Sequence, residues 1–389
     1  MSIRRHALLW LALLTGACSG LSALNPFNWW GNPVGPQPTP LTDIKPTLTI
    51  TPMWRAGVGA APGHRFAPAI TGGTVFAAGQ DGSLAAFDAG DGKQKWRIQA
   101  NRDGLSAGVG ADRDTVVVAT IKGEVLAFDA AGREKWKSRV TSEVLAVPLV
   151  SQDLVIVRSN DNRLFAFDAT DGRRRWVYQR AAPALVLRNF AGMTAADASI
   201  FVGFPGGRLI ALNRSNGSVR WDAAVAQPRG ATELERIADL SSAPAMGDRM
   251  VCAVAFQGRA ACFDPGNGQP LWTREMSSHA GIAVDARYAY VSDDRSAVVG
   301  LAAGSGSSLW RQDRLLHRGV SAPLSLGRAV LVGDYQGVVH ALAREDGTLI
   351  GRVQTDGGWI GSGPLPLNLP GRDSFVVQTR SGGLFAFSL

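Results

Sequence analysis

The sequence predicts an all-β protein, an eight-bladed β-propeller whose blades are four-stranded antiparallel sheets. A short unit recurs eight times, at spacings that run from 38 residues between Phe263 and Leu301 to 51 residues between Leu212 and Phe263. About 40 residues is the period of a four-stranded propeller blade. Glycine accounts for 46 of the 389 residues, which suits many turns better than long helices.

The unit is clearest at residues 82–96 and consists of a strand, a tight turn and the beginning of a second strand. From Leu84 onward, successive side chains fall on alternate faces, which is the period of a pleated strand. The pair Asp91-Gly92 then suits a turn, because glycine tolerates a positive φ and aspartate can bond its own backbone. Trp96 follows as a large apolar side chain on the next strand.

Three landmarks keep the register from unit to unit. The strand position is aromatic or leucine at Phe87, Phe128, Phe167, Leu212, Phe263, Leu301, Leu342 and Phe387. A turn glycine is followed four residues later by Trp96, Trp136, Trp176, Trp221, Trp272 and Trp310, whereas the seventh unit has Gly351 there. A proline suits the start of an innermost strand, where its missing N–H is tolerated, at Pro68, Pro148, Pro244 and Pro323.

The two ends of the chain are predicted to share one blade. The eighth unit stops at residues 387–389, before its turn and tryptophan, and the strand-like run 49–54 ends in Trp54 just before the first complete unit. We expect this run to pair with the C-terminal strands and close the ring, because closure removes exposed sheet edges. Residues 48–389 are therefore predicted to form a single propeller domain.

Residues 1–17 have the pattern of an export signal, with Arg4 and Arg5 before an apolar run too short to span a bilayer. The run leads into Leu-Thr-Gly-Ala-Cys, which resembles the lipobox of bacterial lipoproteins. The resemblance implies that Cys18 is acylated and becomes the mature N-terminus, and Ser19 after it implies sorting to the outer membrane. An ordinary signal peptide with an incidental Cys18 is the alternative.

Residues 18–47 are predicted to be a tether, because their six prolines disfavour both a helix and a central strand. Trp29 and Trp30 within it suit either a lipid interface or a contact with the domain. The net charge is +8 and becomes +6 when Arg4 and Arg5 leave with the signal. The basic residues are scattered and form no stripe with interleaved aromatics, so nucleic-acid binding is not expected.

The unit G-x-L-x-A-[FL]-[DN]-x-x-x-G-x-x-x-W resembles the tryptophan-docking repeat of PQQ-dependent quinoprotein dehydrogenases, over about residues 49–389. The resemblance implies their fold but not their activity. Those enzymes hold the quinone with Ca²⁺, carboxylate ligands, a catalytic aspartate and usually a disulfide between adjacent cysteines. This chain has three cysteines, none adjacent, and no acidic cluster at ligand spacing. The five histidines are isolated, and no zinc, nucleophile-elbow or phosphate-loop motif is present.

We therefore predict no catalytic residue, no cofactor and no metal. Cys252 and Cys262 flank a predicted hairpin turn near Gln257-Gly258. Either a cross-strand disulfide or two separately buried thiols is consistent with that placement in an oxidising compartment.

Two segments interrupt the regular units, and we expect function to be concentrated there. The first, 181–189, contains Leu-x-Leu-Arg, which suits an inner strand equally well. The second, 227–240, pairs Thr232 with Glu235 in a capping-box pattern.

The capping box precedes Leu234, Ile237 and Ala238, which would share one apolar face of a short helix. The second segment is therefore predicted to be helical, with a solvated loop as the alternative.

The lipobox, tether, eight PQQ-like units and the run from Thr232 to Arg236 together resemble the BamB family, the lipoprotein propellers of the outer-membrane β-barrel assembly (BAM) machine. The resemblance implies a monomeric, non-enzymatic scaffold at the periplasmic face of the outer membrane. Its implied partners are the POTRA domains of BamA, other BAM subunits and unfolded precursors, whose insertion it would assist. A truncated quinoprotein oxidoreductase and a periplasmic ligand-binding propeller are the alternatives.

In that family the two irregular segments adjoin each other and contact BamA, and the matching residues here are Leu185, Leu187, Arg188 and Asp239. We therefore expect the two leucines to be buried anchors of the interface, with Arg188 and Asp239 fixing the orientation by charge. Ser241 stands where the family usually has a second acidic residue.

Overall fold

The computed structural model describes residues 36–181, 183, 185–188 and 191–389. The predicted signal 1–17, Cys18, and Trp29 and Trp30 of the tether lie outside these residues. The chain divides into the units Met1–Pro38 and Thr39–Leu389, and the 32 strands found in the described residues all belong to the second unit. The described residues contain no helix, and so none that could cross a membrane.

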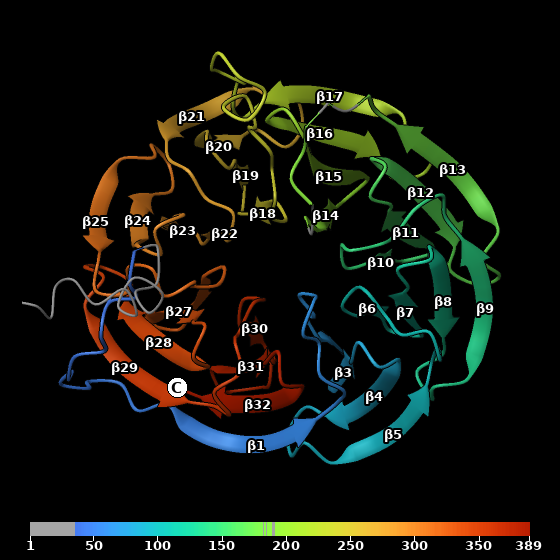
Figure 1. Ribbon diagram of the computed structural model, residues 1–389, viewed down its shortest axis with the longest axis horizontal. Coiled ribbons are helices and arrows are strands. Elements are labelled where there is room, and N and C mark those ends of the chain that lie inside the picture. The colour runs from blue at the N-terminus through green and yellow to red at the C-terminus, as the bar shows by residue number, and fades with distance from the viewer. Residues whose placement is uncertain (1–35, 182, 184, 189–190) are drawn as a thin grey trace, which may run out of the picture. The chain divides into compact units, whose positions relative to one another are not determined.

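The strands form eight four-stranded antiparallel sheets, which are the blades of a propeller (Figure 1). Blades 1 to 4 are β2(Ala69–Thr71), β3(Thr74–Ala78), β4(Ser83–Asp88), β5(Gln94–Gln99); β6(Gly110–Asp112), β7(Thr115–Ala119), β8(Glu124–Phe128), β9(Glu134–Arg139); β10(Leu149–Ser151), β11(Leu154–Arg158), β12(Arg163–Asp168), β13(Arg174–Gln179); and β14(Met193–Ala196), β15(Ser199–Phe204), β16(Arg208–Asn213), β17(Val219–Ala224). Blades 5 to 8 are β18(Ala245–Met246), β19(Val251–Val254), β20(Arg259–Phe263), β21(Pro270–Glu275); β22(Gly281–Val284), β23(Tyr288–Ser292), β24(Val298–Ala302), β25(Ser308–Gln312); β26(Leu324–Leu326), β27(Ala329–Gly333), β28(Val338–Ala343), β29(Leu349–Gln354); and β30(Leu365–Pro366), β31(Ser374–Gln378), β32(Gly383–Ser388), β1(Thr51–Gly57).

Burial differs between the middle and outer strands of a blade. All five residues of β3, β7 and β11 are buried, because both faces of a middle strand pack against neighbouring blades. Apart from Thr74, Thr115 and Arg158 at their ends, these strands are short continuous apolar runs. The outer strand β13 is largely exposed and buries Trp176. The four predicted prolines each directly precede an innermost strand, as expected.

The ring closes as predicted, because the N-terminal strand β1 pairs antiparallel with the C-terminal strand β32. Thr51 lies opposite Ser388, Arg55 opposite Phe385, and Gly57 opposite Gly383. The eighth blade is thus built from both ends of the chain (Figure 1).

Seven joints between blades are held by a tryptophan of one blade on a turn of the next. Each indole N–H donates to a backbone carbonyl in that turn at 2.6–3.0 Å. The ring covers the turn glycine so closely that an added Cβ would lie 2.4–3.0 Å from the nearest ring atom. At Gly172, which lies under Trp136, φ is also +71°, so glycine is required there by both space and backbone conformation. The pairs are Trp54–Gly92, Trp96–Gly132, Trp136–Gly172, Trp176–Gly217, Trp221–Gly268, Trp272–Gly306 and Trp310–Gly347.

The joint between blades 7 and 8 is built differently, because Gly351 stands where the other blades have tryptophan. The third and fourth strands of blade 8 are β32 and β1, the last and the first of the 32 strands, so no hairpin turn connects them and a tryptophan would have no turn to dock on. Residues from the N-terminus cover this joint instead. The backbone N–H of Leu48 donates to Ile350 O at 2.9 Å. Leu48 and Ile50 are each only 8% exposed and pack in one cluster with Phe387.

We call residues 39–50 the N-terminal strap. Residues 39–47 of the strap were assigned to the tether by the sequence, and in the structure they lie on blades 6 and 7. Thr39 N donates to Leu316 O at 3.0 Å, and Arg352 Nη1 donates to Thr42 O at 3.1 Å. Leu41 and Ile44 pack against the core between these two blades.

Candidate partner-binding surface

The two irregular segments are the longest connections between blades. The first joint, residues 180–192, connects β13 to β14, and the second joint, residues 225–244, connects β17 to β18. Both therefore emerge beside blade 4, which separates them in the ring (Figure 1). In the first joint, Leu185–Arg188 is not a strand, so the inner-strand interpretation does not apply there.

Asp239 links the two joints. Its carboxylate accepts one hydrogen bond from the backbone N–H of Leu187 at 2.7 Å and another from that of Gly206 at 3.0 Å. Its own backbone carbonyl accepts from Phe256 N at 2.9 Å. The side chain of Asp239 thus holds the first joint and the β15–β16 turn of blade 4. Its backbone holds the second joint to blade 5.

Asp239 is only 1% exposed, so its charged carboxylate interacts with groups of this chain and not with solvent. The sequence predicted that this charge sets the orientation of a partner. The structure places the carboxylate where it sets the position of the first joint, because two backbone N–H groups occupy its oxygens.

The other three predicted residues lie on the first joint at or near the surface. The side chain of Leu185 is 42% exposed, and Leu187 is partly buried. Half of the Arg188 side chain is exposed, and its Nη2 lies 3.3 Å from Glu143 Oε2 in the connection between β9 and β10. The ion pair is too exposed to contribute much stability, but it orients the guanidinium.

The predicted helix of the second joint does not form, although its capping box does. Glu235 N donates to Thr232 Oγ1 at 3.2 Å, and the Glu235 carboxylate accepts from Thr232 N at 3.1 Å. The hydrogen bonds from Thr232 N and Ala231 N lower the pKa of the Glu235 carboxyl. Only one turn follows, and its tip residue Leu234 is 65% exposed.

The helix prediction is wrong because tertiary packing overrides the local signal. Ile237, Ala238 and Leu240 all enter the core, with exposed fractions of 6%, 1% and 0%. After the single turn the backbone bonds to a distant segment instead of to the preceding turn, since the carbonyl of Asp239 accepts from Phe256 N at 2.9 Å.

Sequence reasoning missed Arg158, the last residue of β11, which is 3% exposed beneath these joints. The available signal was a charged residue at the end of a strand whose other four residues are apolar.

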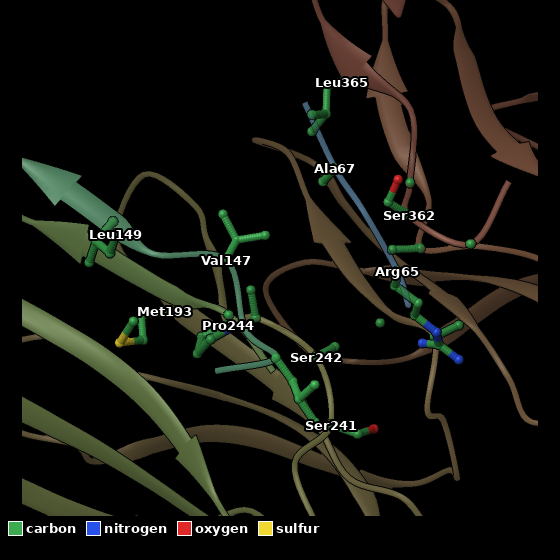
Figure 2. Close-up of a pocket in the computed structure, with 18 of the residues that line it drawn as sticks. Arg65, Ala67, Val147, Leu149, Met193, Ser241, Ser242, Pro244, Ser362 and Leu365 are labelled. Carbon is green, nitrogen blue, oxygen red and sulfur yellow. The ribbon is translucent and has the colours of Figure 1, made fainter. Parts of the chain in front are cut away.

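The central channel contains a cavity of about 440 Å³, lined mainly by small and apolar residues (Figure 2). Figure 2 shows Val147, Leu149 and Met193 among its walls, with Arg65 and Ser362 also lining it. No carboxylate is among the described residues that line it, and no group of three His, Cys, Asp or Glu residues in the described ranges is placed to bind a metal. Because Ca²⁺ requires several oxygen ligands, usually including carboxylates, this lining does not fit the Ca²⁺-quinone site of quinoprotein dehydrogenases.

Cys252 and Cys262 face each other across β19 and β20 and form a disulfide, with their Cα atoms 4.0 Å apart. Of the two possibilities that the sequence leaves open, the structure contains the cross-strand disulfide.

The comparisons agree with this architecture. A sequence profile of the family described as "Outer membrane protein assembly factor BamB" matches residues 49–107 and 80–312. The protein of that name from Bordetella pertussis strain Tohama I is 43% identical over 349 residues, which cover 90% of this chain and 89% of the relative.

Solved structures show the same relation. The crystal structure of BamB from Moraxella catarrhalis matches with a TM-score of 0.80 and 26% identity, over 88% of this chain and all of that chain. Quinohemoprotein alcohol dehydrogenase from Comamonas testosteroni matches with a TM-score of 0.70 over 87% of this chain and 76% of that chain, but at 13% identity this shows the fold alone. Taken together with the eight-bladed fold and the two joined segments, these matches show that the chain belongs to the BamB family of outer membrane protein assembly factors.

Proposed function

We propose that this protein is a non-enzymatic scaffold of the outer-membrane β-barrel assembly machine, which docks on the POTRA domains of BamA and assists the insertion of β-barrel precursors. The observation that carries the proposal is the bonding of Asp239. Its carboxylate joins the two irregular segments, which the repeated blades do not need, so that they can act as one surface. A scaffold needs only its blades, so additional structure between them is best explained by a partner.

The docking surface is defined here as the exposed parts of Leu185–Arg188 and of the turn at Leu234. Leu185 and Leu234 present large apolar side chains to solvent, and half of the Arg188 side chain is exposed on the same joint as Leu185. A few apolar and arginine side chains of this kind carry most of the affinity of a protein interface, at about 2 kcal/mol or more each.

The localisation is part of the same proposal. Acylation of Cys18 would attach the chain to the periplasmic face of the outer membrane. Stable attachment takes more than one acyl chain, because a single chain binds a bilayer only marginally. Metabolic labelling with a palmitate analogue tests this: label is expected in the wild type and absent from Cys18→Ala.

Co-purification with BamA from detergent extracts tests the docking. Leu187→Asp and Arg188→Glu are each expected to abolish recovery of BamA, because they place a negative charge in or beside the surface. Leu309→Asp is the matched control, since Leu309 is a leucine 49% exposed on β25 of blade 6, away from both joints. Thermal unfolding should show that all three variants remain folded. Undiminished recovery of BamA with both Leu187→Asp and Arg188→Glu would refute the docking assignment.

A further inference from the structure

We infer that Arg158 is a positioning residue for partner binding, which acts through the β15–β16 turn and Asp239 to hold Leu187 in place. The inference rests on the proposed function, because it explains how the docking surface is held in shape. Arg158 belongs to blade 3 and is not on that surface.

The guanidinium of Arg158 binds the end of the neighbouring blade's second strand. Nη1 donates to Gly203 O at 2.6 Å, and Nη2 donates to Asn162 Oδ1 at 3.1 Å. The group also lies over the ring of Phe204, with 5.0 Å between the guanidinium carbon and the ring centre. Gly203 and Phe204 are the last residues of β15, so a cation from blade 3 fixes the point at which blade 4 begins its turn.

The turn carries this constraint to Asp239. Gly206, two residues after Phe204, donates its N–H to one carboxylate oxygen of Asp239, and Leu187 donates to the other. Leu240 packs against Gly203 so closely that an added Cβ on the glycine would lie 2.5 Å from Leu240 Cβ. The path from Arg158 to Leu187 is therefore a series of short contacts that runs through the buried Gly203 and Asp239.

The charges of Arg158 and Asp239 also couple these two residues. Burial lowers the pKa of Arg158 to about 10, and the negative charge of Asp239 acts in the opposite direction. A buried cation is costly without a compensating anion, so removing either partner leaves the other in an unfavourable environment. The two residues should therefore behave as a unit.

Arginine suits this position better than lysine or an apolar residue. Its planar group donates in two directions while it stacks on an aromatic ring, whereas lysine has a single ammonium group. Arg158→Lys is therefore expected to retain the charge but to hold Gly203 and Phe204 less firmly.

Blade 7 offers a matched control on the opposite side of the ring. Arg318 and Asp334 are also buried, at 2% and 0% exposure, and Arg318 Nε donates to Asp334 Oδ2 at 2.8 Å. Arg318 likewise lies over an aromatic ring, that of Tyr335, at 5.2 Å. Arg318→Met thus removes a comparable buried arginine without contacting either joint.

The test measures the affinity of the full-length acylated protein for purified BamA in detergent, together with the melting temperature. Arg158→Met and Asp239→Asn are each expected to weaken binding at least tenfold, and the double variant to bind no more weakly than the weaker single variant. Arg318→Met should lower the melting temperature by a similar amount with an unchanged Kd. Wild-type affinity in Arg158→Met would overturn the inference. So would a loss of affinity in the double variant that equals the product of the two single losses.

Hydrogen exchange gives a second readout that does not need BamA. Arg158→Lys, the conservative variant, should fold and still accelerate exchange of the Leu187 and Gly206 amides relative to amides of blade 7. Unchanged exchange at both amides would contradict the positioning role. If Leu187→Asp and Arg188→Glu abolish binding while Arg158→Met does not, only this inference fails. If Leu187→Asp and Arg188→Glu both bind normally, the proposed function fails first.

Discussion

Truncation of Leu48 and Ile50, the two strap residues that cover the joint between blades 7 and 8, should destabilise the propeller about as much as removal of a docked tryptophan. The perturbation is Leu48→Ala with Ile50→Ala, which empties the site that the strap fills beside Gly351. Both side chains are 8% exposed and belong to the cluster between blades 7 and 8. Trp136→Ala, at an ordinary joint, is the comparison.

The magnitude follows from the burial. Truncation of a buried leucine or isoleucine to alanine typically destabilises by about 2–5 kcal/mol, and the low end applies here because Leu48 and Ile50 each keep 8% exposure. The double variant should therefore lose about 4–6 kcal/mol. Trp136→Ala should lose about 3–5 kcal/mol, by the range for large aromatic truncations.

Equilibrium urea unfolding followed by circular dichroism measures the difference. Leu309→Ala, on an exposed leucine of β25, should change stability by less than about 0.5 kcal/mol and serves as the control. A loss below about 1 kcal/mol in the strap variant would refute the idea that the strap replaces the missing tryptophan. Gly351→Trp should not strengthen the joint, because even a Cβ there would lie 2.8 Å from Leu48 O.

Three further predictions concern other parts of the ring. Gly172→Ala should destabilise by about 2–4 kcal/mol in urea unfolding, because φ is +71° and the new Cβ would lie 2.6 Å from the Trp136 ring; stability within 0.5 kcal/mol of wild type would contradict the docking geometry. Alkylation of denatured protein should label neither Cys252 nor Cys262 before reduction and both after it, and labelling without reductant would contradict the disulfide. Replacing both cysteines with alanine should lower the free energy of unfolding by about 2.5 kcal/mol, as expected for a ten-residue loop. Burial lowers the pKa of His340 below its usual value near 6.5, although its contact with Asp334 acts in the opposite direction. Below about pH 6.5 the unfolded chain therefore binds a proton that the folded chain resists, so the free energy of unfolding should fall by up to about 1.4 kcal/mol per pH unit. His340→Gln should flatten this slope, and equal slopes for the two proteins would contradict the prediction.

The propeller could be predicted because its rules are local and repeated. Each docked tryptophan and its turn glycine occur in adjacent copies of one unit, so a single pattern predicts seven joints. Closure of the ring was predictable for the same reason, since Trp54 completes the unit that ends at Phe387. The sequence also shows the exception at Gly351, but its cause requires knowing which strands meet in blade 8.

The site was only partly predictable, because its construction depends on contacts between distant segments. The capping box at Thr232 and Glu235 is a local signal and is present, whereas the helix that it favours does not form, because the backbone at Asp239 bonds to Phe256 of blade 5. Asp239 was singled out as a surface charge, but its bonds to Leu187 and Gly206 span 52 and 33 residues. No local pattern indicates such partners.

The strap also determines how the domain responds to a mechanical load on its N-terminus. Tension applied ahead of Thr39 acts first on the contacts of Thr39 and Thr42 with blades 6 and 7, and then on the bonds of Thr47 and Leu48 to Ile350. Only after these contacts have broken in turn does the force reach β1, whose pairing with β32 closes the ring. The closure of the propeller is therefore shielded from tension that enters the domain at Thr39.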